Sequence, residues 1–579
     1  MRACLSYSHL LLLPPFALPE KIDPIVLAIL LLIVAVIHGL TLLWRRWQKK
    51  VLLRNLRLYW GLPRTPSDEA EFKKIGLYYR LKTRDSANGL DDKTWTDLNL
   101  DQVFEFIDRT SSRVGQQYLY DLLRTPKFEE EPLLRFEQLV NRFEDEKLRE
   151  GLQMELHHLN HKDALFLPHL FLEDLPQLRI HRFVFLGLTL ATVASFVGAL
   201  SVPAFRPILI LLGIVNMLTS MYYRRQLDAF IQPFRLLNVL INTSQKIASE
   251  YGRSKISTEI EKLADEAMSL SGVRRKTALL AFDREHEDLA SLIYQYLNMF
   301  FLLDVNCYAF TVEELRRKRK NVTALFEGLG YLDAAISVAS ARYGNVKFTT
   351  PKFYDRVKIC RFRRLYHPLL QSPVPNDLLV NARGILITGS NMSGKSTFIR
   401  TVGVNVVLAQ TIHTCFAEEY LAPFLDVKVS MGAADSLTES KSHYLAEVES
   451  VRVLVESAQS GTQCLFLLDE LFRGTNTVER VAAAKAILEY LNRGDNIVMV
   501  ATHDIELAEL LGHRYECHHF REVIHHQQME FDYRIQPGTS STRNAIAILK
   551  LLGYPQTITT EALQVVDQLA RDKSRTRVR

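Results

Sequence analysis

Residues 384–400 read GILITGSNMSGKSTFIR, in which an apolar, strand-like run passes into a loop that begins and ends with glycine. The loop satisfies the spacing G-x-x-x-x-G-K-[ST], with Lys395 and Ser396 in the last two positions. Glycines let the backbone bend so that its N–H groups point at phosphate oxygens, and a following helix adds the positive end of its dipole. The stretch therefore predicts a site for the phosphates of a nucleoside triphosphate.

The residue types at the end of this loop indicate how the nucleotide would be held. Lys395 can reach the β- and γ-phosphates, and the Ser396 hydroxyl is a suitable ligand for Mg²⁺. We therefore expect ATP and Mg²⁺ to bind here. The predicted nucleotide-binding residues are Gly389, Ser390, Asn391, Met392, Ser393, Gly394, Lys395, Ser396 and Thr397.

Two adjacent carboxylates end a second apolar run, CLFLLDELFRGTN at residues 464–476. In NTPases with a phosphate-binding loop, an aspartate at such a strand end helps to hold Mg²⁺, which predicts that role for Asp469. Glu470 would then orient or deprotonate the attacking water. An apolar strand that ends in Asp-Glu can be purely structural when it stands alone, but its combination with the loop favours catalysis.

A third apolar run, IVMVATHD at residues 497–504, ends beside a histidine. Because α/β sheets bind their ligands at the carboxyl ends of the strands, His503 is predicted to sense the γ-phosphate or to position water. A lone histidine is more often structural, so its place at a strand end is what carries this prediction.

The patterns around these motifs predict the elements that position them. Residues 226–343 are mostly helical in pattern, whereas short β-rich runs begin at about residue 344 and alternate with helices from 384 onward. Such alternation is typical of a parallel sheet with crossover helices. The predicted fold is an α/β P-loop NTPase domain, C-terminal to an all-α core or lever region, with about three transmembrane helices.

The first of these transmembrane helices is predicted at residues 25–44, IVLAILLLIVAVIHGLTLLW, a nearly unbroken apolar run. This is about the length needed to cross a bilayer core of roughly 30 Å at about 1.5 Å per residue. Arg45, Arg46, Lys49 and Lys50 follow, and the positive-inside rule then puts the C-terminal side in the cytoplasm. A cleaved signal peptide is the alternative, but the run is long and no small-residue cleavage site follows it.

A second apolar block consists of residues 183–202 and 207–223, joined by a short turn. Arg182 precedes it and Arg225 follows it, so both flanks fit a helical hairpin that enters from the cytoplasm and returns to it. Buried core helices are the alternative, although a soluble helix normally has a polar face. The sequence thus predicts a multi-pass protein of the cytoplasmic membrane whose ATPase domain lies in the cytoplasm.

Composition bounds these interpretations without deciding between them. The 579 residues suggest several domains, and the apolar fraction of 47% averages over local extremes. A net charge of +6 fits a polyanionic partner and equally fits the basic cytoplasmic loops of a membrane protein. The 6 cysteines include no C-x-x-C pair, so neither a disulfide framework nor a zinc site is expected.

These patterns divide the chain into segments, and no internal repeat or low-complexity linker interrupts them. The predicted segments are an N-terminal membrane anchor (1–60), the first half of a helical core (61–180), a transmembrane hairpin (181–225), a helical lever with the second core half (226–343), the ATPase domain (344–560) and a basic C-terminal helix or tail (561–579).

Four stretches, taken in order, resemble the ATPase domain of MutS-type mismatch-repair proteins. They are GSNMSGKSTFIRTVGVNVVLAQ (389–410), DSLTESKSHYLAEVESV (435–451), LLDELFRGTNT (467–477) and ATHD (501–504). The Asn-Met pair inside the loop is a distinctive mark of that family. ABC transporter ATPases share the general chemistry, but their signature lies much further beyond the phosphate-binding loop.

The resemblance continues outside the ATPase. Residues 98–123 look like the start of the MutS core, 332–342 like its return, 366–370 like the approach to the loop, and 538–555 like the segment that closes the ATPase domain. In this family each ATPase site is completed by a partner, which implies a homodimer through the ATPase domain. The mismatch-recognition domain, the full DNA clamp and the nuclease appendage of one branch are expected to be absent.

The resemblance also implies two further site residues. Asn391 would help to place the catalytic water near the γ-phosphate, and Ser442 would reach across the dimer to the partner's nucleotide. The segment around Ser442 departs from the family pattern, because Ser440-Lys441 stands where glycine and arginine are usual, and His443-Tyr444 where threonine and phenylalanine are. An exposed polar helix cap is the alternative interpretation of this segment.

The expected function is ATP-dependent binding of mismatched or branched DNA, as in mismatch repair, by an ATPase tethered to the membrane. Two alternatives stay open: an ATPase that acts on a membrane-protein partner without DNA, and a slow nucleotide-switched scaffold. Basic stretches at 316–320 and 570–579 could contact DNA or anionic lipid, although solvated surface explains such runs more often. The histidines within 157–161 and 513–526 fit no standard metal spacing.

Overall fold

The chain divides into two compact units, Met1–Tyr59 and Trp60–Arg579. The computed structural model describes residues 24–64, 69–84, 89–178, 180–252, 258–277, 289–344, 347–355, 357–390, 393–431, 443–472, 475–525, 528–539, 546, 549–550 and 553–576. Asn391, Met392 and Ser442, three of the predicted site residues, lie outside these ranges.

The described part of the first unit is one long helix, α1 (Pro24–Leu58). It contains the predicted apolar segment 25–44 and continues through the basic residues after it. Leu32, Val36 and Leu40 expose 65%, 52% and 60% of their surface, and Trp44 and Trp47 follow with ring centroids 5.0 Å apart. An exposed apolar stretch followed by tryptophans is typical of a helix that enters a membrane, and its crossing stays a prediction.

The second unit begins with a helical part that is interrupted by a hairpin. Before the hairpin lie α2 (Glu69–Ile75), α3 (Leu77–Lys82), α4 (Asp92–Asp97), α5 (Leu100–Ile107), α6 (Arg113–Arg124), α7 (Glu130–Arg142), α8 (Glu146–Leu156) and α9 (His169–Leu172), with short 3-10 turns at His157–Leu159 and Lys162–Phe166. After it lie α12 (Thr258–Ser269), α13 (Ser271–Thr277), α14 (Leu289–Phe301), α15 (Leu303–Arg317) and α16 (Arg319–Gly344). The helical patterns in both halves are confirmed.

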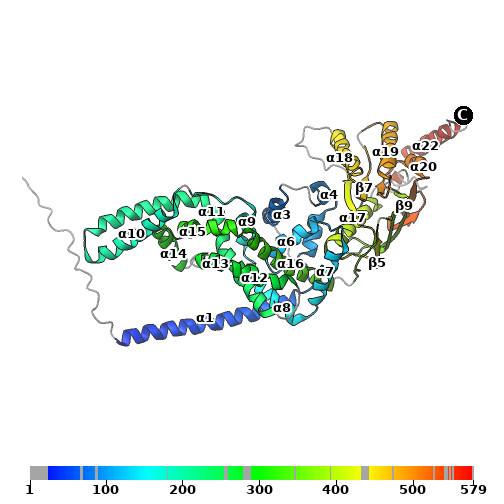
Figure 1. Cartoon of the computed structure of the whole chain (residues 1–579). Helices are drawn as coiled ribbons and strands as arrows, with labels where there is room; N and C mark the ends of the chain where they lie inside the picture. The colour runs from blue at the N-terminus through cyan, green and yellow to red at the C-terminus, as the bar shows by residue number, and fades with distance from the viewer. Residues whose placement is uncertain are drawn as a thin grey trace, which may run out of the picture. The chain divides into compact units, whose positions relative to one another are not determined.

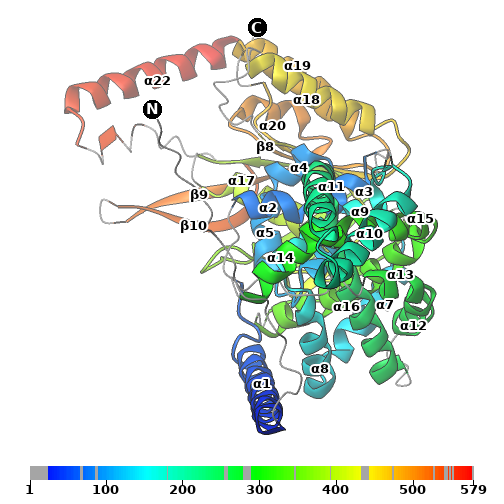
Figure 2. The same ribbon diagram turned by 90° about the vertical axis from the view of Figure 1, so that its left-hand side faces the viewer.

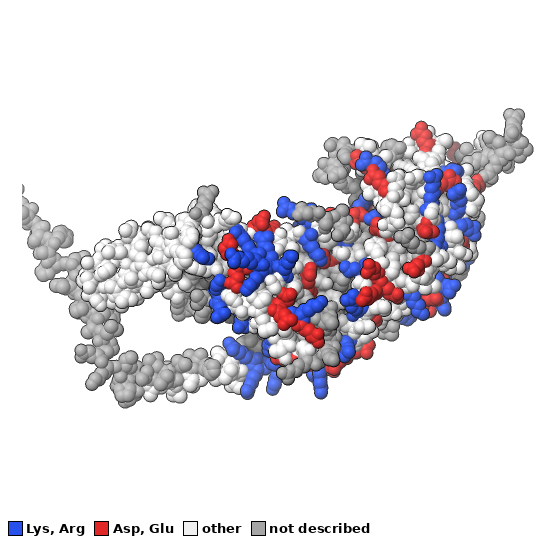
Figure 3. All heavy atoms as spheres, viewed as in Figure 1, with Lys and Arg blue, Asp and Glu red and all other residues white. Residues whose placement is uncertain are grey.

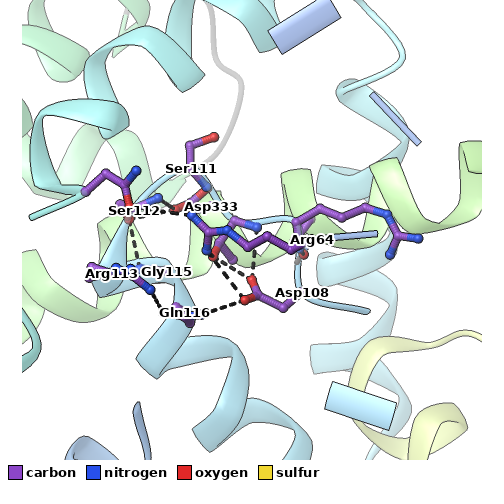
Figure 4. Close-up of polar contacts among 12 residues, drawn as sticks. Arg64, Asp108, Ser111, Ser112, Arg113, Gly115, Gln116 and Asp333 are labelled. Carbon is purple, nitrogen blue, oxygen red and sulfur yellow. Dashed lines mark hydrogen bonds and ion pairs between the residues drawn. The ribbon is translucent and has the colours of Figure 1, made fainter. Parts of the chain in front are cut away.

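A buried carboxylate joins the two halves of this helical part. Asp333 of α16 accepts hydrogen bonds at the start of α6 from Ser111 N (2.8 Å), Ser112 N (2.8 Å) and Ser112 Oγ (2.6 Å) (Figure 4). Burial raises the pKa of Asp333 to about 6, although these hydrogen bonds oppose the shift. A Cβ on Gly115 would lie 2.2 Å from Asp333 Oδ2, so glycine is needed for the close approach of the two helices.

The hairpin consists of α10 (Arg182–Ser201) and α11 (Phe205–Tyr251), which run side by side (Figure 1). Helix α11 has 47 residues, so the predicted segment 207–223 continues without a break into the helical part. Figure 3 shows the visible face of the hairpin almost free of charged side chains, with Lys and Arg gathered where the hairpin meets the other helices.

Length and apolar composition alone would allow three helices among the described residues to cross a membrane. They are Arg182–Ser201, Phe205–Leu227 and Arg319–Gly344. The last, α16, is largely buried among the other helices, which is the environment of a core helix. The first two coincide with the predicted hairpin. Their apolar side chains are exposed rather than packed in the protein core, as is typical of a surface that another apolar partner covers.

The rest of the second unit is built on two sheets. The larger has the order β10-β9-β4-β8-β7-β6, with β4 (Gly384–Thr388), β6 (Asp426–Met431), β7 (Cys464–Asp469), β8 (Ile497–Ala501), β9 (Tyr515–His525) and β10 (Gln528–Pro537). Its strands are parallel from β9 to β6, which confirms the predicted parallel sheet, and β10 pairs antiparallel to β9. The smaller sheet has the order β1-β5-β2-β3, with β1 (Lys352–Phe353), β2 (Ile359–Leu365), β3 (Asn376–Asn381) and β5 (Glu419–Ala422).

Helices cover both faces of the larger sheet (Figure 2). Ile385 and Ile387 of β4 pack into the same cluster as α17 (Lys395–Ile412), whereas Leu386 between them packs with α18 (His443–Ser457), α19 (Thr477–Leu491) and α20 (Ile505–Leu511). This alternation follows from the period of two in a strand and explains why β4 is apolar throughout. A last helix, α22 (Gln556–Thr576), ends the described chain.

Candidate nucleotide-binding site

The three predicted motifs meet because their strands are neighbours in the sheet. Strand β8 lies between β4 and β7, and Ala501 of β8 is in register with Ile387 on one side and Asp469 on the other. Thr502 N donates to Ile387 O at 3.0 Å, and Glu470 N donates to Ala501 O at 2.9 Å. The phosphate-binding loop, the carboxylate pair and the histidine therefore leave the sheet at the same edge.

Both glycines of the loop are required by its conformation. Gly389 has φ = 143° and Gly394 has φ = 105°, in a region that side-chain-bearing residues rarely adopt. A Cβ on Gly389 would also lie 2.8 Å from Phe520 O. The two glycines therefore give the loop the backbone bends that the sequence motif predicts.

Lys395 is buried at the first position of α17 and turns back over the loop. Its Nζ donates to Gly389 O at 2.9 Å and to Ser390 O at 2.7 Å, while Ser393 Oγ also donates to Ser390 O at 2.9 Å. The ammonium charge and the N-terminus of a helix therefore lie together, which makes a strong site for anionic oxygens.

Glu470, His503 and Lys395 form one polar cluster. His503 Nε2 lies 2.7 Å from Glu470 Oε1 and 3.5 Å from Lys395 Nζ. Glu470 has φ = 52° and Phe472 has φ = 62°, so the backbone after β7 is left-handed at two residues that are not glycine. Such conformations are costly and are found mostly where function needs them. Phe472 N donates to Glu447 Oε1 of α18, which ties this turn to a neighbouring helix.

The residues predicted to hold Mg²⁺ fit that cation. Asp469 is 8% exposed, and its Oδ1 has no hydrogen-bond partner among the described residues. Ser396 lines a cavity together with Glu470, the neighbour of Asp469. A buried carboxylate oxygen without a donor and a hydroxyl are oxygen ligands that Mg²⁺ prefers. Among the described residues, no group of three or more His, Cys, Asp or Glu side chains is arranged to hold a metal ion.

The cavity beside the loop extends well beyond the space needed for phosphates. It measures about 520 Å³ and continues from Lys395 and Ser396 to His367, Asn376 and Tyr533. Asn376 Nδ2 donates to Tyr533 O at 2.9 Å, which fastens the β9–β10 ribbon to the smaller sheet. The aromatic ring of Tyr533 and this apolar extension suit a nucleotide base.

His367 is the histidine in this extension. It is 7% exposed, and burial, helped by the charge of Arg400, lowers the pKa of His367 to about 4. Its Nδ1 accepts a hydrogen bond from Leu369 N at 3.3 Å, which requires an unprotonated nitrogen. His367, Asn376 and Tyr533 were not identified from the sequence, although His367 lies within the quoted stretch 366–370.

An ion pair holds the turn that carries His503. Arg480 of α19 donates from Nε to Asp504 Oδ2 at 3.0 Å and from Nη2 to Asp504 Oδ1 at 2.7 Å. Asp504 directly follows His503, and its N–H donates to Thr502 Oγ1 at 3.0 Å. The two parallel hydrogen bonds fix the backbone beside the imidazole. No motif in the sequence pointed to this pair.

A second buried ion pair connects the end of α17 to the helical part. Arg342 of α16 donates to Glu137 Oε1 (2.8 Å) and Oε2 (2.6 Å), and it also reaches His413 O (3.0 Å) and Thr414 Oγ1 (2.9 Å). His413 Nδ1 lies 3.2 Å from Glu137 Oε2. Burial alone would raise the pKa of Glu137, but hydrogen bonds from His413 and Arg342 outweigh it and lower the pKa to about 2.

Comparison with known families and proteins agrees with this geometry. Residues 385–570 match the model of MutS domain V. The chain is 32% identical to the DNA mismatch repair protein MutS of Thermus aquaticus over 268 residues, which are 45% of this chain and 32% of that protein. It is 30% identical to MutS of Petrotoga mobilis over 347 residues, 56% of this chain and 42% of that protein. The chain therefore spans about a third of the length of the curated relatives that match it first.

Proposed function

Because this chain is a member of the MutS family by its domain V, we propose that it binds and hydrolyses ATP with Mg²⁺. We further propose that the ATP cycle governs binding of mismatched or branched DNA while the protein is tethered to the cytoplasmic membrane. The observation that carries the proposal is the convergence of His503 on Lys395 and Glu470, which both line one cavity. The relatives named above are DNA mismatch repair proteins, and that is the source of the expected DNA partner.

The predicted catalytic and Mg²⁺-binding residues have distinct roles in hydrolysis. Lys395 neutralises charge on the β- and γ-phosphates. Glu470 takes the proton of the attacking water or orients that water, and His503 holds the carboxylate in place through the 2.7 Å contact. Ser396 and Asp469 would hold Mg²⁺, which supplies further positive charge beside the phosphates.

We propose that two copies meet through their ATPase domains. Val478, at the start of α19, is 77% exposed, and Leu445 of α18 is 47% exposed. Exposed apolar side chains beside a charged site are typical of a surface that a partner covers. Ser442, which lies outside the described residues, would then contact the partner's nucleotide, as the family resemblance implies.

The membrane tether rests on the exposed apolar surface of α1, α10 and α11. On α10 alone, Leu190, Val197 and Leu200 expose 59%, 59% and 74% of their surface. Water is a poor environment for so much contiguous apolar surface, whereas acyl chains suit it. The basic residues that flank both apolar segments then indicate a cytoplasmic ATPase domain.

The test is ATP turnover by the full chain in nanodiscs, without DNA and with perfectly paired, mismatched and branched duplexes. Lys395→Ala serves as the inactive reference, and Lys485→Ala, a partly exposed lysine on α19, is the matched control. We expect Lys395→Ala alone to abolish turnover, and DNA to change the wild-type rate in a way that weakens with salt. Robust turnover that is indifferent to every duplex would overturn the DNA partner.

A further inference from the structure

A helix break lies next to the hairpin, between α14 and α15. Helix α14 ends at Phe301, α15 begins at Leu303, and Leu302 between them has φ = 51°. A break of this kind leaves the last carbonyl groups of α14 without partners inside their own helix. In water such carbonyls bind solvent, but in a hydrocarbon layer the protein itself must supply the donors.

Side chains from three helices supply these donors. Asn216 Nδ2 of α11 donates to Phe300 O at 2.6 Å, Thr189 Oγ1 of α10 donates to Phe301 O at 2.8 Å, and Asn306 Nδ2 of α15 also reaches Phe301 O at 3.4 Å. Asn216 is fully buried although it lies in the middle of an apolar helix. Polar side chains at such positions are expensive unless they satisfy other polar groups, as Asn216 Nδ2 does here, whereas Asn216 Oδ1 has no hydrogen-bond partner among the described residues.

The position of the break relative to the basic flank follows from helix geometry. Thr189 lies seven positions after Arg182 in α10, which is roughly 10 Å at about 1.5 Å per residue. In α15, Phe310 lies eight positions after Leu302, or roughly 12 Å, and the Arg182 guanidinium lies 5.7 Å from the Phe310 ring. Both estimates put the break well beyond the basic flank, at the depth of the apolar hairpin.

Helix α14 continues the exposed apolar surface at this depth. Tyr296, Leu297 and Phe300 expose 60%, 44% and 40% of their surface, and the helix sequence, LASLIYQYLNMFF, has no charged residue. The Phe300 ring approaches α11 at Gly213, where a Cβ would lie 3.0 Å from Phe300 Cε1. With 13 residues, α14 is about 20 Å long and too short to cross a bilayer core of roughly 30 Å.

We propose that α14 lies within the membrane as a helix that contacts acyl chains without crossing, and that α10, α11, α14 and the start of α15 form one membrane-embedded unit. This inference rests on the membrane tether proposed above. Internal satisfaction of the carbonyls at the break favours lipid over water, and the absence of charge on α14 disfavours nucleic acid. The chain leads from this unit through α15 directly into α16, which carries Asp333 and Arg342.

The test places a single spin label at one of three positions in the full chain in nanodiscs, after Cys4 and Cys517 are replaced by serine. Leu297→Cys reports on α14, Val197→Cys on the hairpin, and Leu510→Cys on α20, where 44% exposure matches that of Leu297. Accessibility is measured to oxygen, which partitions into lipid, and to a water-soluble nickel complex. We expect labels at 297 and 197 to favour oxygen and the label at 510 to favour nickel.

The outcomes separate this inference from the proposed tether. A label at 297 that favours nickel, while the label at 197 favours oxygen, would overturn the inference and leave the tether in place. Nickel access at all three positions would overturn both. Asn216→Leu, which removes the donor to Phe300 O, should increase nickel access at 297, whereas Asn242→Leu on the exposed side of the same helix should not. Equal spectra for these two variants would overturn the role of the buried donors.

Discussion

The carboxylate of Glu470 lies 2.7 Å from His503 Nε2, although the two residues come from different strands. Strand β8 carries His503 and lies between β4, which leads into the phosphate-binding loop, and β7, which leads into Glu470. Of the three strands that carry the motifs, β8 is therefore the one that pairs with both of the others. His503 can respond to phosphate on one side and hold the catalytic carboxylate on the other.

Replacing Glu470 by glutamine should separate binding from hydrolysis. Glutamine keeps the size and can still hydrogen bond to His503, but it cannot accept a proton from water. We expect kcat to fall by about 10²- to 10⁴-fold, while binding of a fluorescent ATP analogue is retained. Glu489→Gln on α19 is the control for a glutamate-to-glutamine change, and Lys395→Ala should lose binding as well. Near-normal turnover of Glu470→Gln would exclude its assignment as the catalytic carboxylate.

The Arg480–Asp504 pair should act on the rate through His503. Two hydrogen bonds between charged groups are worth about 1.5–3 kcal/mol, so Arg480→Ala should lower kcat by roughly tenfold or more. Because the pair lies outside the lining of the cavity, KM for ATP should change little, whereas the loss of these hydrogen bonds should lower the Tm by a few degrees. In a double-mutant cycle, adding Asp504→Ala to Arg480→Ala should cost little more. Additive losses in kcat would show that Arg480 and Asp504 do not act through their ion pair. Lys485→Ala is the control on the same helix.

Tyr533 should determine affinity for the base. A base stacked on an aromatic ring contributes about 1–3 kcal/mol, so Tyr533→Ala should raise KM for ATP roughly tenfold with kcat nearly unchanged. Tyr533→Phe retains the ring and should behave as the wild type. Tyr554→Ala, at a tyrosine of similar exposure outside the lining of the cavity, is the matched control. A fall in kcat at unchanged KM would show that the ring acts on the phosphates instead.

Local spacing made part of the site predictable from the sequence. The loop glycines, Lys395 and Ser396 lie within one short stretch, so the backbone geometry they need follows from neighbouring residues. The pair Asp469–Glu470 and His503 were predictable for a similar reason, because each directly follows a buried strand. These residues converge because their strands are adjacent in the sheet.

The rest of the site depends on contacts that spacing does not encode. Tyr533 reaches the cavity because the β9–β10 ribbon lies on Asn376, 157 positions away in the chain. Arg480 meets Asp504 only because α19 packs beside the turn after β8. Helix α14 was missed as a membrane element because its 13 residues are too few to cross, and the donors that satisfy its end come from other helices.

The Glu137–Arg342 ion pair should make the contact between α17 and the helical part less stable in acid. The pKa of Glu137 is about 2 in the folded protein against a reference of 4.5, so the pair stabilises the fold fully above about pH 4.5. That stability is lost as the pH falls from about 4.5 through about 2, and it amounts to about 3 kcal/mol.

Glu137→Gln should therefore lower the Tm of the full chain in nanodiscs at pH 7, and the difference from the wild type should shrink to roughly half or less at about pH 3. Glu144→Gln, at an exposed glutamate of the same helical part, should leave the Tm unchanged at both pH values. A Tm difference for Glu137→Gln that stays constant with pH would mean that the glutamate stabilises by packing alone. Loss of the difference at acid pH would instead establish that its negative charge, shared between Arg342 and His413, holds the ATPase domain on the helices.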